Sequence, residues 1–251
     1  MNSKMMKDLI KAANEGDVEA QNSLGWIYRS GDGVEKDLEK AIFWYSEAAK
    51  QGDENTQFTL GYIYKSGNGV EQDLEKALHW YSEAAKLGEI NAQFNLGFMY
   101  MYGEGVEIDL EKALYWLSEA ANRGNYIATT FLGSMYSLGE GVEKDDEKAL
   151  HWYSEAAKQG DVEAKYYLGC MYEFCDGIEK DLKKALYWFS EAAKQGNHRA
   201  QFNLGCMYYS GQGVEPDFEK ALYWFSEAAK QGNVNAKEAC ERITQYIALA
   251  A

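Results

Sequence analysis

Proline is almost absent from this chain, since only one of its 251 residues is proline, against 24 glycines. Such a composition argues against a proline-rich disordered chain and favours many short helices that end at glycine. Cysteine is scarce as well: the four cysteines, Cys170, Cys175, Cys206 and Cys240, crowd the last third of the sequence and show no recurring paired spacing. A disulfide framework is therefore not indicated, and a reducing cytoplasm fits this usage best.

Positive charge is in short supply. Lys and Arg total 25 against 40 Asp and Glu, which leaves a formal net charge of -15. Nucleic-acid binding depends on Lys and Arg against phosphate, and anionic membrane surfaces attract the same side chains, so neither partner is expected. A basic protein or peptide would be steered toward such a chain. The charge can also serve only to keep the protein soluble, and both interpretations stay open.

Long apolar runs are missing too. The first residues, Met1 to Lys11, contain no apolar run of about 7–15 residues, so we expect no signal peptide in this sequence. No stretch approaches the length of about 18 apolar residues that a membrane-spanning helix needs. We therefore expect a cytoplasmic protein that is not inserted in a membrane. A secreted protein from which a signal was removed is the alternative.

What the sequence does contain is one phrase that occurs six times. Its first copy runs from Gly31 to Gly52 (GDGVEKDLEKAIFWYSEAAKQG). A fixed period of about 20–50 residues is typical of stacked repeats, in which each repeat packs only against its neighbours. The period therefore predicts one elongated array over residues 1–251 rather than two globular domains. The register is marked by tryptophans 36 residues apart: Trp44, Trp80, Trp116, Trp152, Trp188 and Trp224.

Each repeat divides into two helical patterns. In the first repeat, apolar residues at 20, 24, 27 and 28 predict a first helix over about residues 18–30. A second apolar stripe at 38, 41, 42, 45, 48 and 49 predicts a second helix after Asp37, which is placed to cap it. Six such pairs fill residues 16–231. Residues 1–15 look like the end of a second helix and residues 232–251 like a lone first helix, so both are interpreted as caps.

Three recurring residues indicate how the pairs pack. Gly25 stands in the middle of the first helix, at a cost of about 1 kcal/mol relative to alanine, and glycine returns at this place in all six repeats. We expect it to admit the close approach of a neighbouring helix. Gly31 suits the left-handed conformation that ends a helix. Trp44 flanks the apolar stripe of the second helix and is expected to pack between successive repeats.

The pattern is broken at two places. Asp146 stands where the pattern has a leucine at the start of the second helix. Cys175 replaces the first glycine of the loop that follows the fifth first helix. Both departures are expected to weaken the local packing, since one puts a carboxylate at an apolar position and the other removes a residue that tolerates the left-handed conformation.

Over residues 16–231 the phrase Ala-x-x-x-Leu-Gly-x-x-Tyr-x-x-Gly-x-Gly-Val-x-x-Asp-x-x-Lys-Ala-x-x-Trp-x-x-x-Ala-Ala-x-x-Gly resembles the Sel-one-like repeat family, a relative of the tetratricopeptide repeats. Departures from it are few, among them Thr56 in place of the first-helix alanine. The resemblance implies an all-α fold, a right-handed superhelical solenoid of antiparallel helix pairs with 36 residues per pair. It also implies a scaffold or adaptor for other proteins, without catalytic residues.

No motif of catalytic or cofactor chemistry stands out. The Gly-x-Gly loops follow a helix rather than a strand and lack a third glycine, so a dinucleotide site fails its structural context. His79 and His151 share a position held elsewhere by Phe43 and by tyrosines, which favours ring packing over a metal site. Cys170 and Cys206 share a position in adjacent repeats, and we favour small buried thiols over a disulfide. We therefore expect no enzyme activity, no metal and no cofactor.

The positions at which the repeats disagree are the ones expected to contact a partner. On the first helix, residues 23, 26 and 30 lie on one stripe, away from Leu24 and Tyr28. In tetratricopeptide-like proteins the first helix lines the concave side, so the resemblance places this stripe in a groove. Exposed rings there suit partner anchoring, whereas rings packed between repeats would be structural, and both interpretations stay open. The partner-binding candidates are the aromatic residues Trp26, Tyr62, Phe98, Tyr102, Phe131, Tyr167 and Phe174.

The sequence thus predicts a protein–protein interaction scaffold or adaptor that binds a peptide or protein in its concave groove. Acidic composition favours a basic partner, and the chain is expected to be a monomer. A narrower alternative is an inhibitor or immunity-type protein that binds and blocks a toxin or effector enzyme. An enzyme with an unrecognised site and a self-assembling rod are the remaining alternatives.

Overall fold

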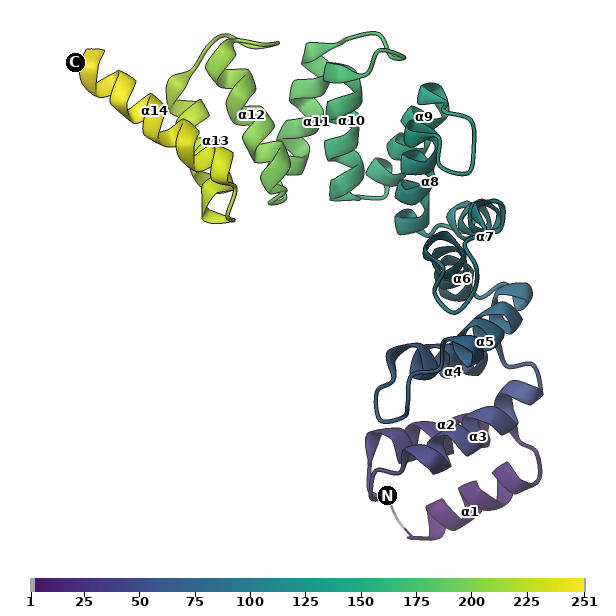
Figure 1. The fold of residues 1–251 in the computed structure, drawn as a ribbon. Coiled ribbons are helices and arrows are strands. Elements are labelled where there is room, and N and C mark those ends of the chain that lie inside the picture. The colour runs from purple at the N-terminus through teal and green to yellow at the C-terminus, as the bar shows by residue number, and fades with distance from the viewer. Residues whose placement is uncertain (1–2, 251) are drawn as a thin grey trace. The chain divides into compact units, whose positions relative to one another are not determined.

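A computed structural model describes residues 3–250 of the chain, with the side chains of residues 4–245. All regular structure in this part of the chain is helical, in fourteen helices, which confirms the all-α prediction. Close contacts group the helices into two compact units, Met1–Asn125 and Tyr126–Ala251, called here the N-terminal and the C-terminal unit (Figure 1). One continuous array over both units stays a prediction.

Helix boundaries follow the 36-residue period in both units. The N-terminal unit contains α1 (Ser3–Asn14), α2 (Val18–Ser30), α3 (Leu38–Lys50), α4 (Glu54–Ser66), α5 (Leu74–Leu87), α6 (Ile90–Tyr102) and α7 (Leu110–Asn122). The C-terminal unit contains α8 (Tyr126–Leu138), α9 (Asp146–Lys158), α10 (Val162–Phe174), α11 (Leu182–Lys194), α12 (His198–Ser210), α13 (Phe218–Lys230) and α14 (Val234–Ala250). Even numbers from α2 to α12 mark the first helices of the repeats, and odd numbers from α3 to α13 mark the second helices.

Within each unit, a first helix packs against the second helix of its own repeat and against the second helix that precedes it in that unit. First helices of neighbouring repeats also approach each other, α4 to α6 and α10 to α12. No two second helices among the described residues come as close. The first helices therefore form the more tightly spaced side of each unit.

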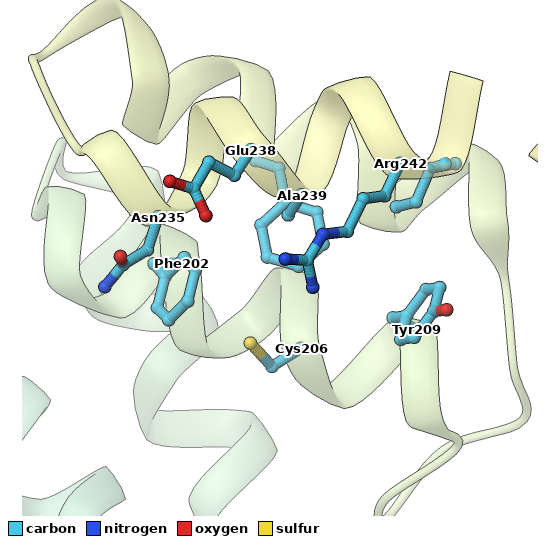
Figure 2. A pocket seen from close by; sticks show the side chains of 9 residues that line it. Phe202, Cys206, Tyr209, Asn235, Glu238, Ala239 and Arg242 are labelled. Atoms are coloured by element: carbon cyan, nitrogen blue, oxygen red, sulfur yellow. The ribbon is translucent and has the colours of Figure 1, made fainter. Parts of the chain in front are cut away.

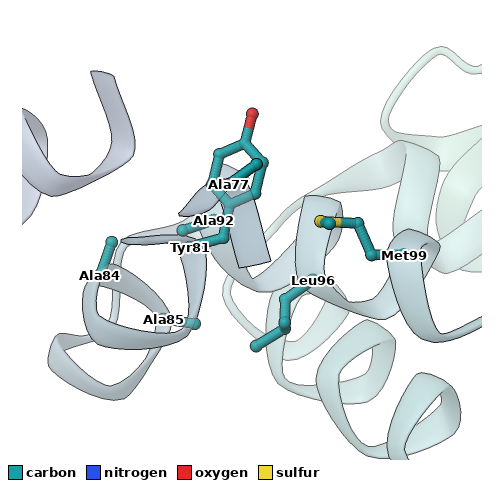
Figure 3. Close-up of a cluster of buried hydrophobic side chains, with 7 residues drawn as sticks. All are labelled: Ala77, Tyr81, Ala84, Ala85, Ala92, Leu96 and Met99. Carbon is teal, nitrogen blue, oxygen red and sulfur yellow. The ribbon is translucent and has the colours of Figure 1, made fainter. Parts of the chain in front are cut away.

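Small and medium apolar residues form the core between successive helices. Alanines on the packed faces let helix axes approach to the near end of the usual separation of about 8–10 Å. Trp116 of α7 packs against the cluster between α5 and α6, as predicted for a tryptophan that joins successive repeats. The same packing is seen for Trp44, Trp80, Trp188 and Trp224. Figure 3 shows this cluster, whose buried members are Ala77, Tyr81, Ala84, Ala85, Ala92, Leu96 and Met99.

The mid-helix glycine makes this close packing possible. A Cβ atom on Gly25 of α2 would lie 2.5 Å from the ring of Tyr45 in α3, closer than real Cβ atoms come to their neighbours. In the other first helices the same place faces a Tyr, Leu or Phe side chain of the second helix at 2.5–2.8 Å. The predicted close approach is confirmed, and the burial of a large side chain against the glycine offsets the low helix propensity of that residue.

Each second helix begins at an aspartate cap, as predicted. Asp37 accepts a hydrogen bond from the backbone N–H of Lys40 at 3.0 Å, and the Lys40 ammonium lies 2.7 Å from the same carboxylate. These hydrogen bonds from Lys40 hold the pKa of Asp37 below its ordinary value. The equivalent caps are Asp73, Asp109, Asp145, Asp181 and Asp217.

Helix α14 lacks the mid-helix glycine of the first helices. Glu241 of α14 stands where the six first helices have glycine. At the matching place in α12, a Cβ atom on Gly205 would already lie 2.7 Å from the ring of Phe225. α14 therefore departs from the six first helices at the residue that admits the second helix of each pair. Ala236 and Ile243 bury the opposite face of α14 against the unit. The cap expected over residues 232–251 stays a prediction.

Candidate binding surface

The seven predicted partner-binding residues lie on first helices of both units. Trp26, Tyr62 and Tyr102 are about half exposed, at 55%, 49% and 52%, and Phe174 is 65% exposed. The other three, Phe98, Phe131 and Tyr167, are half-buried. We call the surface made by residues equivalent to 23, 26 and 30 the first-helix stripe, and the place of Trp26 its central position. The rings are thus at least partly accessible, and each is carried by a helix that is packed against its neighbours.

The N-terminal unit presents rings at every central position of its three repeats. Phe98 lies 5.9 Å from Phe94 and 4.4 Å from Tyr102, measured between ring centres, so the three rings of α6 support one another. Groups of large, partly exposed rings are typical of contact surfaces. The residues at the central position are Trp26, Tyr62 and Phe98.

Cations of the chain itself cover two of these rings. The Arg29 guanidinium of α2 lies 6.0 Å from the centre of the Tyr62 ring of α4. The Lys65 ammonium of α4 lies 5.4 Å from the ring of Phe98 and 2.8 Å from the carboxylate of Glu104. Each cation comes from the first helix that precedes the ring, so neighbouring repeats are joined across the stripe.

The C-terminal unit has small residues at the same central positions: Ser134, Cys170 and Cys206. A pocket of about 300 Å³ opens between α12 and α14, lined by Phe202, Cys206 and Tyr209 on one side and by Arg242 on the other (Figure 2). The side chains of Cys206 and Arg242 both extend toward the hollow in Figure 2. Where the N-terminal unit presents rings, this unit presents a cavity.

A smaller pocket, about 240 Å³, lies between α8, α9 and α10 and contains both departures from the repeat pattern. The Asp146 side chain is 13% exposed, and its Oδ2 atom lies 3.3 Å from the Lys144 ammonium. Its Oδ1 atom is buried without a hydrogen-bond partner among the described residues. Burial raises the pKa of the Cys175 thiol, and a hydrogen bond to the Asp146 carboxylate acts in the same direction. The two departures are therefore in contact with each other.

The loop at Cys175 has changed its conformation accordingly. Cys175 ends α10 with φ -82° and ψ 121°, which is extended backbone, whereas Gly31 ends α2 in the left-handed region at φ 77°. An L-residue with a side chain avoids the left-handed region, so the substitution and the altered loop have one cause. The Tyr153 and Tyr167 rings beside this loop are stacked, 5.0 Å apart.

Three charged residues near the stripe of the C-terminal unit were missed by the sequence analysis: Glu173, Arg199 and Arg242. Glu173 of α10 is only 8% exposed, and its Oε2 atom has no hydrogen-bond partner in the described part of the chain. Burial raises the pKa of this carboxyl above its ordinary value. The sequence could have indicated this residue, because the equivalent residues of α2 and α4 are the cations Arg29 and Lys65. A carboxylate at this place reverses the local charge.

Arg199 of α12 joins two first helices in the C-terminal unit. Its guanidinium lies 4.4 Å from the centre of the Tyr166 ring and 5.6 Å from that of Tyr167, both on α10. It also forms an ion pair with the carboxylate of Glu163. The half-buried Tyr167, one of the predicted partner-binding residues, is therefore partly engaged by the chain itself.

The cysteines are half-buried free thiols. This confirms the preference for thiols over a disulfide between Cys170 and Cys206, although neither residue is fully buried. Burial raises the pKa of the Cys206 thiol to about 11, and it also raises the pKa of Cys170. Both thiols are therefore protonated and unreactive at neutral pH.

A second row of rings runs along the second helices. Each ring lies edge-on to the tryptophan that follows it, with ring centres 4.9–5.3 Å apart, as expected for ring packing. The rings nevertheless remain exposed. They provide a comparison for the stripe, because they are exposed rings on the other helices of each pair. The row consists of Phe43, His79, Tyr115, His151, Tyr187 and Tyr223.

The residues that the structure describes contain neither a metal-binding cluster nor a membrane-spanning helix. No three His, Cys, Asp or Glu side chains of this part of the chain are gathered so that they could hold a metal ion. None of the described helices is long and apolar enough to cross a membrane.

Comparison with protein families finds the family described as Sel1 repeat six times in the chain. The matched segments are residues 18–53, 56–89, 90–125, 127–161, 162–197 and 198–233. Each of them takes in one first helix and the second helix that follows it. The matches therefore follow the helix pairs of the structure.

Solved structures are similar over most of the chain. A protective antigen present in uropathogenic Escherichia coli strains, described as displaying an SLR fold, is 37% identical over 95% of this chain, with a TM-score of 0.88. The chain spans about half of that antigen, 51%. A Sel1 repeat protein from Oxalobacter formigenes is 34% identical over 92% of this chain and 100% of its own, with a TM-score of 0.71. No curated protein matches the chain.

Proposed function

Because the chain belongs to the Sel1 repeat family, we propose that it is a protein-binding scaffold whose first-helix stripe contacts a peptide or protein partner. The observation that carries the proposal is the exposure of large rings on the closely spaced side of the N-terminal unit, where Trp26, Tyr62 and Tyr102 are each about half exposed. Interface energy concentrates in aromatic anchors of this kind.

Rigidity of the helices supports this role. Phe98 and Tyr102 stand on α6, which is fixed between α5 and α7 by the buried residues around Leu96 and Met99. Rings on such a support lose little conformational freedom when a partner binds, so less of the contact energy is spent on ordering the surface. The stripe is thus organised before the partner arrives.

The negative net charge of the chain favours a basic partner, because attraction raises the rate at which the two proteins meet. The net charge of -15 attracts a positively charged protein over distances of about 8–10 Å at moderate salt. Contacts of the partner's cations with the stripe rings are less suitable, because Arg29 and Lys65 already cover Tyr62 and Phe98. We therefore expect the partner to meet the stripe through apolar groups and to carry its positive charge at the periphery of the contact.

The test compares two triple variants of the whole protein. Tyr62→Ala/Phe98→Ala/Tyr102→Ala removes the stripe rings, and Phe43→Ala/His79→Ala/Tyr115→Ala removes three rings from the second helices of the same unit. Both are used to capture proteins from the lysate of the source cell, with identification by mass spectrometry. We expect the first variant to lose a partner that the wild type and the second variant retain, with binding at least tenfold weaker.

Thermal unfolding of both variants controls for loss of the fold. Light scattering of the wild-type protein alone tests whether it is a monomer, as the comparison of the variants assumes. A partner that is lost only with the second-helix rings would place the site on the opposite helices and contradict the proposal. Identical sets of captured proteins on all three baits would do so as well.

A further inference from the structure

The pocket between α12 and α14 corresponds in the 36-residue period to the place between α4 and α6 in the N-terminal unit, and the residues at the two places differ. Each of these two places is called a groove below. The period assigns to every residue of one groove an equivalent residue four repeats later. Phe202 keeps the aromatic character of Phe58, so one wall of the groove is unchanged. The bulk of the groove is lost through three replacements, which are Tyr62 by Cys206, Phe94 by Glu238 and Asn95 by Ala239. The cavity of about 300 Å³ lies where these larger side chains are missing.

Rings on the first helices are covered by cations from a neighbouring first helix elsewhere in the protein. This arrangement occurs in both units, and in each case the ring and the cation come from successive first helices. A cation above a ring face is attracted by the negative charge of the π-system. The four pairs are Arg29 with Tyr62 at 6.0 Å, Lys65 with Phe98 at 5.4 Å, and Arg199 with Tyr166 at 4.4 Å and with Tyr167 at 5.6 Å.

In the groove between α12 and α14 the cation has no ring against it among the described residues. Arg242 stands on α14 at the place where α6 has Phe98, and Tyr209 stands on α12 at the place where α4 has Lys65. Cation and ring have therefore exchanged helices. Within the described residues, Arg242 has neither an ion pair nor a ring contact. Figure 2 shows its guanidinium extending over the hollow, near Cys206.

We propose that this pocket binds an aromatic side chain of the partner protein, which lies against Phe202 and Phe225 and is covered by the Arg242 guanidinium. The inference rests on the proposed function, because it names what the first-helix side of the C-terminal unit accepts. The ring centres of Phe202 and Phe225 lie 5.5 Å apart, and Tyr209 is held by an edge contact with Phe218, also at 5.5 Å. The walls are therefore fixed before the ring enters.

The chemistry of the pocket favours an aromatic group over an aliphatic one. Both kinds of side chain would cover the apolar walls. Only an aromatic ring also presents a negative face to the guanidinium, and a planar guanidinium stacks on such a face. An aliphatic group would take water away from Arg242 without replacing it. The cavity, at about 300 Å³, has room for a single ring of this kind.

The experiment uses the whole protein and a small probe, N-acetyl-4-fluorophenylalanine amide, followed by fluorine NMR. The probe is neutral, so the net charge of -15 does not attract it. We expect its signal to broaden and shift as protein is added. We also expect N-acetyl-leucine amide to displace it about fivefold less effectively than N-acetyl-phenylalanine amide, the factor that corresponds to one cation–ring contact.

Variants locate the probe. Cys206→Tyr restores the side chain that α4 carries at the same place and should abolish binding by filling the hollow. Arg242→Gln leaves the hollow open and should weaken binding about three- to fivefold, whereas Arg242→Lys should retain most of it. Lys237→Gln, which removes an exposed cation from the same helix outside the residues that line the pocket, is the matched control and should bind like the wild type.

Equal displacement by the leucine and phenylalanine amides would overturn the inference, and so would unchanged binding to a folded Cys206→Tyr variant. If that variant does not fold, Arg242→Gln decides, since the side chain is exposed and its loss leaves the core intact. The capture experiment with the stripe variants is independent of the probe. Failure of the probe with successful capture refutes the pocket alone, and failure of capture refutes the scaffold.

Discussion

At the central position of the first-helix stripe, the N-terminal unit carries Trp26, Tyr62 and Phe98, and the C-terminal unit carries Ser134, Cys170 and Cys206. The first helices beneath these residues have the same length and the same mid-helix glycine, and the second helices paired with them begin at the same aspartate caps. The difference between rings and a hollow therefore arises from side chains alone. A repeat protein can change its contact surface at such positions without changing the interfaces that hold its helices together.

The irregular residues are concentrated in the C-terminal unit. Asp146, Glu173 and Cys175 each depart from the residue type that the other repeats favour, and two of them leave a buried carboxylate oxygen without a partner. Such groups cost about 1–3 kcal/mol each when buried unpaired. Departures that lower stability are often found where a protein meets its ligand. The pocket that contains Asp146 and Cys175 is consistent with this view.

The largest expected effect tests whether the helix pairs of the two units are packed in the same way. Gly61→Ala and Gly205→Ala place a Cβ atom 2.6 Å and 2.7 Å from the rings of Tyr81 and Phe225. Overpacking of this kind outweighs the gain in helix propensity, so we expect each variant to lose about 2 kcal/mol of stability. Equal losses, measured by urea unfolding, would confirm equivalent interfaces.

Ser23→Ala and Asn203→Ala are the matched controls, because both residues lie on the stripe side of a first helix and neither faces the second helix of its repeat. Their unfolding midpoints should stay close to that of the wild type. A glycine variant that is tolerated in one unit and not in the other would show that the helix pairs are packed differently, and the comparison of their surfaces would lose its basis.

The scaffold could be predicted from the sequence because its rules repeat. Gly25 predicted the close approach of a neighbouring helix, and Asp37 predicted the start of a helix. Trp44 predicted packing between successive repeats. The structure confirms all three predictions. Each rule was stated six times in one chain, so a chance pattern was improbable. The resemblance to the Sel-one-like repeat family is confirmed by the six matched segments.

The surface could be predicted only in outline. The period identified which side of the first helices varies, and the rings of the candidates are accessible there. It did not reveal that Arg29 and Lys65 cover two of them, nor that Asp146 meets Cys175, because both findings depend on which residues of successive repeats face each other. Comparison of repeats locates a position on its own helix and leaves its neighbours undetermined.

A smaller effect is expected from restoring the repeat pattern in the C-terminal unit. Asp146→Leu removes a buried unpaired oxygen but also the acceptor of the Cys175 thiol, so we expect a gain of about 0.5 kcal/mol. Together with Cys175→Gly, which readmits the left-handed end of the helix, the gain should reach about 1.5 kcal/mol. The excess over the sum of the single variants measures their contact, by a double-mutant cycle of unfolding free energies.

The smallest expected effect concerns Glu173, whose equivalents in the N-terminal unit include the cations Arg29 and Lys65. Burial raises the pKa of this carboxyl above its ordinary value of 4.5, although Lys180 lowers it in part. The folded state therefore holds the proton more tightly than the unfolded state, so the contribution of Glu173 to stability falls as pH rises through the interval above 4.5. Glu173→Gln carries no such charge, so its free energy of unfolding should exceed that of the wild type by up to about 1 kcal/mol at neutral pH, with the difference vanishing near pH 4.

The aspartate caps, whose pKa values are lowered, weaken both proteins equally in acid, so their effect cancels when the two free energies are subtracted. A difference in unfolding free energy that is constant from acid to neutral pH would mean that the carboxyl gains its charge in the folded protein without penalty.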